Sequence, residues 1–308
     1  MLILRGLFSP DSHPVALTIG NFDGVHLGHQ ALLKELRAAA QARDLPLAVM
    51  VFEPHPREFF TPQQAPVRLT NLREKLELFA DMGVDRVHVC RFNRSFAQMS
   101  AADFASALHE KLAAKFVLIG DDFRFGSKRS GDFALMESVG AQRGFEVQAM
   151  HSVQQNGVRI SSTAVRAALA QGNMVLAQSY LGRPYSISGR VEHGEGLGKK
   201  IGFPTANIQL KHNRPPLNGI FVVRVQGDDL SLTPGVASLG VRPTVHEHGK
   251  PVLEVHLFNF AREIYNKHLR VDFLHKLRDE EKYPNVKMLT QQIALDVENA
   301  KQWFKQHD

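Results

Sequence analysis

The sequence predicts an α/β protein with two domains: an N-terminal doubly wound parallel sheet and a C-terminal small antiparallel β-barrel with a terminal helix. Three observations predict this architecture. Short apolar runs alternate with helical patterns in the first part of the chain, which is typical of a parallel sheet covered by helices. Short strands separated by Gly and Pro follow, as in a small barrel. An amphipathic stretch, residues 289–304, predicts a final helix that packs on the barrel.

The N-terminal elements follow from the spacing of apolar residues. Buried strands are predicted where apolar and β-branched residues run together, at 15–19, 47–52, 85–92, 116–120 and 145–150. Helices are predicted where apolar residues recur at helical spacing, at 27–42, 71–82, 101–112, 132–142 and 162–170. In such a sheet, ligands bind beyond the carboxyl ends of the strands. The loops that begin at Gly20 and Gly120 fall at these ends.

The pattern changes at 181–191, "LGRPYSISGRV", where Gly and Pro begin to separate short apolar runs. The predicted barrel strands are 186–191, 219–225, 235–240, 252–260 and 269–274. A chain of 308 residues is long enough for two cores. We therefore expect two domains, 1–182 and 183–308.

Composition narrows the class of protein. The formal net charge of +6 favours anionic partners, although nucleic acid, small phosphates and a merely basic surface all satisfy it. Cys90 is the one cysteine, so an internal disulfide is excluded, and its apolar neighbours predict a buried structural thiol. The sequence has no signal-peptide pattern and no apolar run of membrane-spanning length. We expect a cytoplasmic protein without a membrane partner.

The stretch 18–30, "TIGNFDGVHLGHQ", places His26 and His29 where a strand turns into a helix. Backbone N–H groups and the helix dipole favour anions there, and glycines let the backbone approach a phosphate. We assign five further residues of this loop to ATP or phosphate binding: Gly20, Phe22, Asp23, Gly24 and Gly28.

Standard phosphate-binding motifs and a zinc site fit this stretch less well. Neither G-x-x-x-x-G-K-[ST] nor G-x-G-x-x-G follows the first strand, which excludes the standard P-loop and dinucleotide-binding motifs. A zinc site needs two ligands besides the histidines, and Asp23 is the one further candidate ligand in this stretch. The two histidines as ordinary capping residues remain an alternative.

The H-x-G-H pattern resembles the nucleotidyltransferase superfamily, and "GNFDGVHLGHQ" resembles the FMN adenylyltransferase module of the bacterial bifunctional riboflavin kinase/FAD synthetases. The resemblance implies a Rossmann-like domain in which both histidines hydrogen-bond the triphosphate of ATP. A second family motif stands at 160–166, "ISSTAVR". It implies that Ser161, Ser162 and Thr163 face the β- and γ-phosphates and that Arg166 supplies a cation. An ordinary serine N-cap with a surface arginine is the alternative.

The flavin side of this site is also implied by the resemblance, through "FEPHP" and "GDDFRFG". The residues concerned are Phe52, Pro54, Asp122, Phe123 and Phe125. The phenylalanines would flank the flavin ring and Asp122 would accept hydrogen bonds from it. Each phenylalanine taken singly fits a core position as well.

The second motif region is 193–207, "HGEGLGKKIGFPTAN". Its glycines and lysines suggest a flexible basic phosphate flap, for which we assign Gly196, Gly198, Lys199 and Lys200. Thr205 and Asn207 offer oxygens on one side of an extended strand, which suits Mg²⁺ carried by ATP. The segment resembles the P-T-A-N motif of riboflavin kinases, which implies a riboflavin kinase-like barrel. An edge-strand turn is the alternative.

The same resemblance implies the remaining kinase residues. Glu254, in an E-x-H context on an alternating strand, is the candidate base for the ribityl 5′-hydroxyl, and a solvated strand carboxylate is the alternative. Arg278 and Tyr283 would contact the flavin, and Arg242 would meet a phosphate. Four residues depart from the usual family pattern: Lys199, Phe221, Ser238 and Asn259. None of these departures removes a proposed catalytic group.

The sequence therefore predicts an enzyme that phosphorylates riboflavin to FMN in its barrel and joins AMP to FMN in its N-terminal domain, giving FAD. ATP and Mg²⁺ would serve both steps, the partners would be small molecules only, and a monomer is compatible with the sequence. One alternative is a single-activity nucleotidyltransferase that acts on another phosphorylated acceptor and carries a regulatory barrel. A second, a nucleic-acid-binding protein, requires clustered Lys and Arg with interleaved aromatics, which the barrel strands lack.

Overall fold

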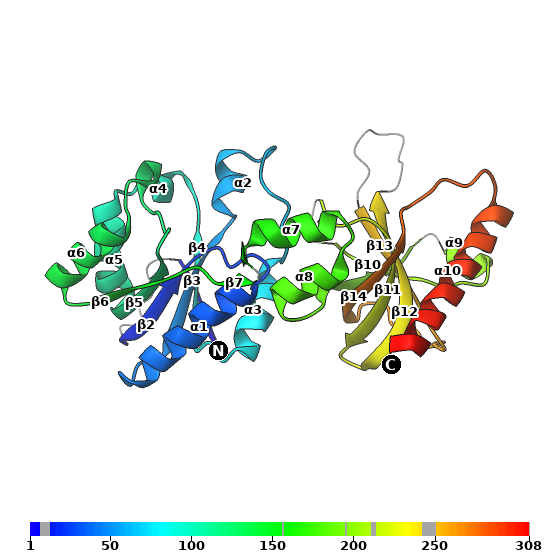
Figure 1. Ribbon diagram of the computed structural model, residues 1–308, viewed down its shortest axis with the longest axis horizontal. Helices are drawn as coiled ribbons and strands as arrows, with labels where there is room; N and C mark the ends of the chain where they lie inside the picture. Colours follow the sequence, from blue (N-terminus) through cyan, green and yellow to red (C-terminus); the bar gives the residue numbers. More distant parts are fainter. Residues whose placement is uncertain (7–12, 156, 195, 211–213, 242–250, 308) are drawn as a thin grey trace. The chain divides into compact units, whose positions relative to one another are not determined.

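The computed structural model describes residues 1–6, 13–155, 157–194, 196–210, 214–241 and 251–307 (Figure 1). Its contacts divide the chain into two compact units, Met1–Pro66 with Leu72–Ser161 and Val67–Asn71 with Ser162–Asp308. Each unit has its own sheet.

The first unit contains a six-stranded sheet in the order β1-β4-β3-β2-β5-β6, and its neighbouring strands are parallel. The strands are β1 (Leu2–Arg5), β2 (Val15–Ile19), β3 (Leu47–Glu53), β4 (Arg86–Arg91), β5 (Ala114–Gly120) and β6 (Glu146–Met150). From β2 the chain builds outward through β3 and β4, and it continues on the other side of β2 with β5 and β6. The predicted doubly wound sheet is confirmed. The edge strand β1 is an addition that the sequence analysis missed.

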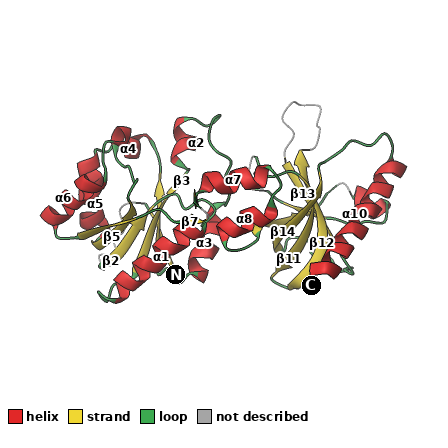
Figure 2. Cartoon of the chain, viewed as in Figure 1, coloured by secondary structure: helices red, strands yellow, loops and turns green. Residues whose placement is uncertain are grey.

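Helices cover both faces of this sheet (Figure 2). They are α1 (Leu27–Gln41), α2 (Pro56–Phe60), α3 (Leu72–Asp81), α4 (Arg94–Ala97), α5 (Ala101–Leu112) and α6 (Phe133–Arg143), with a hairpin of β7 (Gln154–Gln155) and β8 (Val158–Arg159). Successive strand residues project to opposite faces. Ala16 therefore joins the core that contains Leu36 of α1 and Phe79 of α3, whereas Leu17 joins the core that contains Phe104 of α5.

In the second unit, antiparallel strands close into a barrel in the order β10-β13-β12-β11-β14-β9. They are β9 (Tyr185–Glu192), β10 (Ala206–Ile208), β11 (Gly219–Gly227), β12 (Leu230–Val241), β13 (Pro251–Leu257) and β14 (His268–Arg278). Inside, Phe221 and Phe273 are buried and meet edge to face, with ring centroids 5.2 Å apart. On the outer face, Ile220 and Val222 pack against Phe304 of α10 (Val286–His307). The predicted barrel and its terminal helix are confirmed.

The remaining helices of this unit are α7 (Ser162–Ala170), α8 (Met174–Leu181) and α9 (Leu197–Lys200). Helix α8 is not predicted from the sequence, because its residues are apolar on nearly every side and give no helical period. The sequence suggests a flexible flap where the short helix α9 forms. By contacts, α7 and α8 belong to the second unit although they precede residue 183, and the domain boundary at 183 stays a prediction.

Candidate active sites

His26 lies at the end of the loop that joins the carboxyl end of β2 to α1, and His29 is the third residue of α1. Strand β2 lies between β3 and β5, which is where the order of the strands reverses. The loops that follow β2, β3 and β5 therefore share one edge of the sheet. This is the position at which doubly wound sheets bind their ligands, as the sequence analysis predicted.

The two histidine rings are stacked. Their centroids lie 3.7 Å apart, at an interplanar angle of 18°. His26 caps α1, and its Nδ1 accepts a hydrogen bond from the backbone N–H of His29 over 3.4 Å. The capping interpretation thus holds for His26. The Phe22 ring lies 4.9 Å from that of His29 and completes the packing.

The backbone of this loop is constrained. Phe22 and Val25 have φ values of 48° and 41°, a left-handed conformation that costs energy in residues other than glycine. A Cβ on Gly28 would lie 3.1 Å from His26 Nδ1, and one on Gly20 would lie 3.0 Å from the Phe22 ring. A side chain at either glycine would therefore make the Phe22 or His26 ring shift by a few tenths of an ångström.

The histidine pair lies beside a buried cation. Lys75 of α3 is 5% exposed, and its Nζ donates to the backbone oxygen of Asn21 over 2.7 Å. Nδ1 of His29 is buried and has no hydrogen-bond partner among the described residues. Burial, and then the nearby His26 and Lys75, lower the pKa of His29 well below its usual value. His29 is thus neutral in the protein alone, and an arriving anion would favour its protonation.

The second motif divides between the two units. Ser161 is the last residue of the first unit, and α7 begins at Ser162 in the second. Within the second unit, Arg166 Nε donates to the backbone oxygen of Val67 over 2.6 Å. That bond helps to orient the guanidinium.

An aromatic cluster lies beyond β3, where the flavin was expected. Phe52 contacts Phe92 and Phe96, and Phe92 contacts Phe59 and Phe60 of α2, with ring centroids 5.5–6.0 Å apart. The Phe60 side chain is 61% exposed, an unusual position for so large an apolar group. The sequence analysis missed Phe59 and Phe60, although "REFF" follows its "FEPHP" motif directly.

The other flavin candidates have protein partners. Asp122 forms an ion pair with Arg159 over 2.5 Å. Phe125 is 6% exposed, and its ring contacts Phe104 and Phe123. Phe125 therefore packs in the core, and its contact with flavin stays a prediction. Phe123 is partly buried and Asp122 is exposed, so both side chains are more accessible to a ligand. Pro54 lies in the connection between β3 and α2.

In the barrel, strand pairing brings the proposed metal ligand and the proposed base together. Asn207 of β10 lies directly opposite Glu254 of β13. Opposite residues of antiparallel strands project to one face with Cβ atoms about 4.5–5.5 Å apart. Because Leu253 and Val255 are buried on the inner face, Asn207 and Glu254 project outward.

The glycine-rich segment folds onto the P-T-A-N residues. A Cβ on Gly194 would collide with the side-chain amide of Asn207. A Cβ on Gly198 would collide with the backbone oxygen of Phe203 and would lie 3.2 Å from Thr205 Oγ1. These glycines are thus needed for close approach, and the segment also carries the exposed Lys199 and Lys200 on α9.

His256, which the sequence analysis did not assign, holds this arrangement in place. Its Nδ1 lies 2.8 Å from the backbone oxygen of Pro204, so Nδ1 must be the protonated nitrogen that donates. The signal was present in the E-x-H pattern, since His256 shares the outer face of β13 with Glu254.

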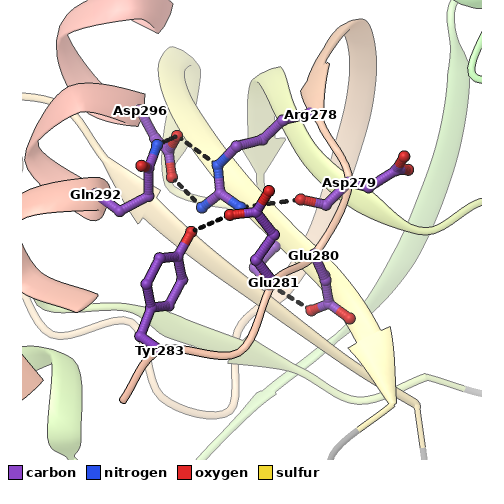
Figure 3. Close-up of polar contacts among 8 residues, drawn as sticks. Arg278, Asp279, Glu280, Glu281, Tyr283, Gln292 and Asp296 are labelled. Atoms are coloured by element: carbon purple, nitrogen blue, oxygen red, sulfur yellow. Dashed lines mark hydrogen bonds and ion pairs between the residues drawn. The ribbon is translucent and has the colours of Figure 1, made fainter. Parts of the chain in front are cut away.

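Arg278 and Tyr283 lie next to α10 (Figure 3). Arg278 Nε and Nη2 donate to the two carboxylate oxygens of Asp296 over 2.8 and 2.6 Å, and Nη1 donates to the backbone oxygen of Asp279 over 2.9 Å. Gln292 also donates to Asp296, which is 4% exposed. The hydrogen bonds to Asp296 raise the pKa of Arg278. Arg278 thus fastens the terminal helix to the barrel, and its contact with flavin stays a prediction.

Three of the residues that depart from the family pattern fit the environments in which the structure places them. The buried ring of Phe221 packs on Phe273, so no hydroxyl is needed there. Asn259 has φ +53°, a conformation that Asn tolerates well. Ser238 donates to Glu280 Oε1 over 3.1 Å. Arg242 lies outside the described residues.

Within the part of the chain that the structure describes, no three His, Cys, Asp or Glu side chains gather as metal ligands. The oxygens of Thr205 and Asn207 suit Mg²⁺ nonetheless, because this ion takes few protein ligands beside substrate phosphates and water. Among the same described residues, no helix has both the length and the apolar character to cross a membrane.

Comparison with known proteins covers both units. An FAD synthetase family model matches residues 8–164, and a riboflavin kinase family model matches residues 181–304. The bifunctional riboflavin kinase/FMN adenylyltransferase of Escherichia coli (strain K12) is 47% identical, over 99% of this chain and 98% of its own. That of Haemophilus influenzae is 46% identical, over 99% of both chains. A crystal structure described as a macrolide-efflux protein from Streptococcus pneumoniae is similar with a TM-score of 0.81 and 28% identity, over 96% of this chain and 97% of that one.

Proposed function

The chain belongs to the family of bifunctional riboflavin kinase/FMN adenylyltransferases, and from this premise we propose how its residues divide the two reactions. The protein phosphorylates riboflavin with ATP to give FMN, and it adenylylates FMN with a second ATP to give FAD and pyrophosphate. The alternative of a single activity with a regulatory barrel is disfavoured, since both family models match in the expected order.

Adenylyl transfer takes place at the loop between β2 and α1. The FMN phosphate attacks the α-phosphorus of ATP in line and pyrophosphate leaves, so no covalent enzyme intermediate is needed. Catalysis then depends on positioning and on neutralising charge. His26 and His29 hydrogen-bond the triphosphate, Ser161, Ser162 and Thr163 bind its outer phosphates, and Arg166 adds a cation. The buried, unpartnered Nδ1 of His29 supports this assignment.

The flavin of FMN stacks on the aromatic cluster that follows β3. Exposed rings of Phe59 and Phe60, backed by Phe92, offer the apolar surface that an isoalloxazine ring needs. We propose that Phe52, Pro54 and Phe123 also contact the flavin, and that Asp122 accepts hydrogen bonds from its polar edge after releasing Arg159.

Riboflavin phosphorylation takes place on the outer face of β10 and β13. Glu254 removes the proton of the ribityl 5′-hydroxyl, which then attacks the γ-phosphorus of ATP. Lys199 and Lys200 bind the phosphates. Thr205 and Asn207 hold Mg²⁺, which neutralises phosphate charge when bound. The pairing of Asn207 with Glu254, under a glycine segment packed on Asn207, is the observation that supports this site best.

Two variants test the division of labour. With riboflavin, ATP and Mg²⁺ supplied, His29→Ala is expected to accumulate FMN without making FAD. Glu254→Gln is expected to make no FMN from riboflavin, yet to convert supplied FMN to FAD at the wild-type rate. Loss of both activities in either folded variant would contradict two separate sites.

Location and partners follow from the substrates. We propose that the protein acts in the cytoplasm, where ATP is available, on small molecules and without a nucleic acid or membrane partner. Activity recovered in a membrane pellet after fractionation of cells would contradict this.

A further inference from the structure

The segment after β14 brings a second carboxylate to the proposed kinase site. Glu280 lies on this segment, two residues after Arg278 (Figure 3). Its Oε1 accepts a hydrogen bond from Ser238 Oγ of β12 over 3.1 Å. A Cβ on Gly240 would collide with the same carboxylate. Glu280 therefore lies across β12, over Ser238 and Gly240.

Ser238 adjoins the proposed base. It lies directly opposite Glu254 in the pairing of β12 with β13, and Glu254 in turn lies opposite Asn207 of β10. Ala237 and Leu239 are buried, so Ser238 projects to the outer face. Ser238, Glu254 and Asn207 thus form one row across three neighbouring strands on the face assigned to the kinase reaction.

The contact with Glu280 decides what Ser238 can do. A hydroxyl has one hydrogen to donate and lone pairs that accept, whereas an ionised carboxylate only accepts. Because the Ser238 hydrogen is directed to Glu280, the Ser238 oxygen is left as an acceptor. On this face, the Ser238 oxygen can accept a hydrogen bond from a hydroxyl of a bound polyol chain.

The segment that carries Glu280 is fixed at its start. Arg278 is held by both oxygens of Asp296, and it bonds the backbone oxygen of Asp279, next to Glu280. Tyr283 further along donates to Glu281 over 3.2 Å. Such support holds a side chain in place before the substrate binds.

We propose that Glu280 is a positioning residue of the riboflavin kinase site, which holds the Ser238 hydroxyl as a hydrogen-bond acceptor for the ribityl chain beside Glu254. The inference rests on the proposed kinase site. It assigns the recognition of a substrate hydroxyl to Ser238 and the orientation of Ser238 to Glu280.

The test compares Ser238→Ala, Glu280→Ala and Gly240→Ala, singly and combined, in the full-length protein. Gly240→Ala displaces the Glu280 carboxylate without changing it. The matched control is Asp279→Ala, which removes a neighbouring carboxylate whose partner is Lys276. For each variant, kcat and KM of riboflavin phosphorylation are measured, together with the rate of adenylylation of supplied FMN.

Each single variant is expected to lower the kinase kcat roughly tenfold, the effect of one lost hydrogen bond in the transition state. The KM for ATP and the adenylylation rate should not change, which shows that the protein is folded and that its nucleotide sites are intact. The double variants Ser238→Ala/Glu280→Ala and Gly240→Ala/Glu280→Ala should be no slower than their slower parents, since one interaction is lost only once. Asp279→Ala should match the wild type.

A wild-type kinase rate for Glu280→Ala, or multiplicative losses in the double variants, would overturn the inference. If a variant lost kcat/KM for ATP only through a higher KM for ATP, the inference would also be overturned. The substituted residue would then bind ATP rather than position the ribityl chain. Failure of the proposed base is distinguished separately, since it would appear as full kinase activity in Glu254→Gln.

Discussion

Removal of one partner of the Arg278–Asp296 pair is predicted to destabilise the second unit strongly. The perturbation is Arg278→Met, which keeps the length of the side chain and removes both hydrogen bonds to Asp296. The Asp296 side chain is 5% exposed and that of Arg278 20% exposed, so removal of the arginine leaves a buried carboxylate supported by Gln292. Breaking a buried pair costs about 3–5 kcal/mol, and the partial exposure of Arg278 favours the lower limit, about 3 kcal/mol.

The assay is urea and thermal unfolding of the full-length protein, followed by tryptophan fluorescence, because Trp303 lies on α10 in the same unit. For a unit of this size the loss corresponds to roughly 6–12 °C in Tm. Arg278→Met/Asp296→Leu should recover to within about 1 kcal/mol of the wild type, since no unpaired charge stays buried. The exposed Lys276–Asp279 pair is the control, and Asp279→Ala should cost less than about 0.5 kcal/mol. A loss below about 1 kcal/mol in Arg278→Met would refute the reasoning.

Three further predictions concern the first unit. His29 has a lowered pKa in the folded protein, so the unfolded chain binds more protons, and stability should fall as the pH drops below about 6.5; urea unfolding from pH 8 to 5 should show a shallower dependence in His29→Asn, and an equal slope would be evidence against the buried neutral imidazole. Gly28→Ala should slow adenylylation roughly tenfold and leave the kinase rate unchanged, because the new Cβ would press on His26 Nδ1. Steady-state rates with supplied FMN check this. A wild-type rate would show that the loop accommodates the added Cβ without displacing His26. Cys90 is 1% exposed, and burial raises its pKa to about 12, so a thiol reagent should label it only as the protein unfolds; rapid labelling in native buffer would contradict its assignment as a structural thiol.

The regular elements of both units could be predicted because their signals are local. The helix at 101–112 has the predicted bounds, since Ser100 caps it and Ala113 ends it in a left-handed conformation. Strand β1 escaped prediction because its four residues gain their stability from pairing with β4, which lies more than eighty residues away in the sequence. Local pattern carries no information on such a partner.

The candidate sites divide in the same way. His26, His29, Thr205, Asn207 and Glu254 stand in short motifs, so the resemblance of these motifs to known families was enough to select them as candidates. Glu280 and Ser238 are 42 positions apart in the sequence, and Arg278 and Asp296 are 18 positions apart. No sequence motif spans either pair, so these contacts could not be predicted. The exposed ring of Phe60 could not be told from a core residue, because exposure is a property of the folded surface.

The central claim is that one chain holds two separate nucleotide sites, one at the loop that follows β2 and one at the glycine-rich segment of the barrel. A crystal structure of the protein with a non-hydrolysable ATP analogue and Mg²⁺ tests it most directly. The account predicts one analogue with its phosphates at the loop from Gly20 to His29 and another at the segment from Gly194 to Asn207. A saturated crystal with the analogue at only one of these places, or at neither, would contradict it.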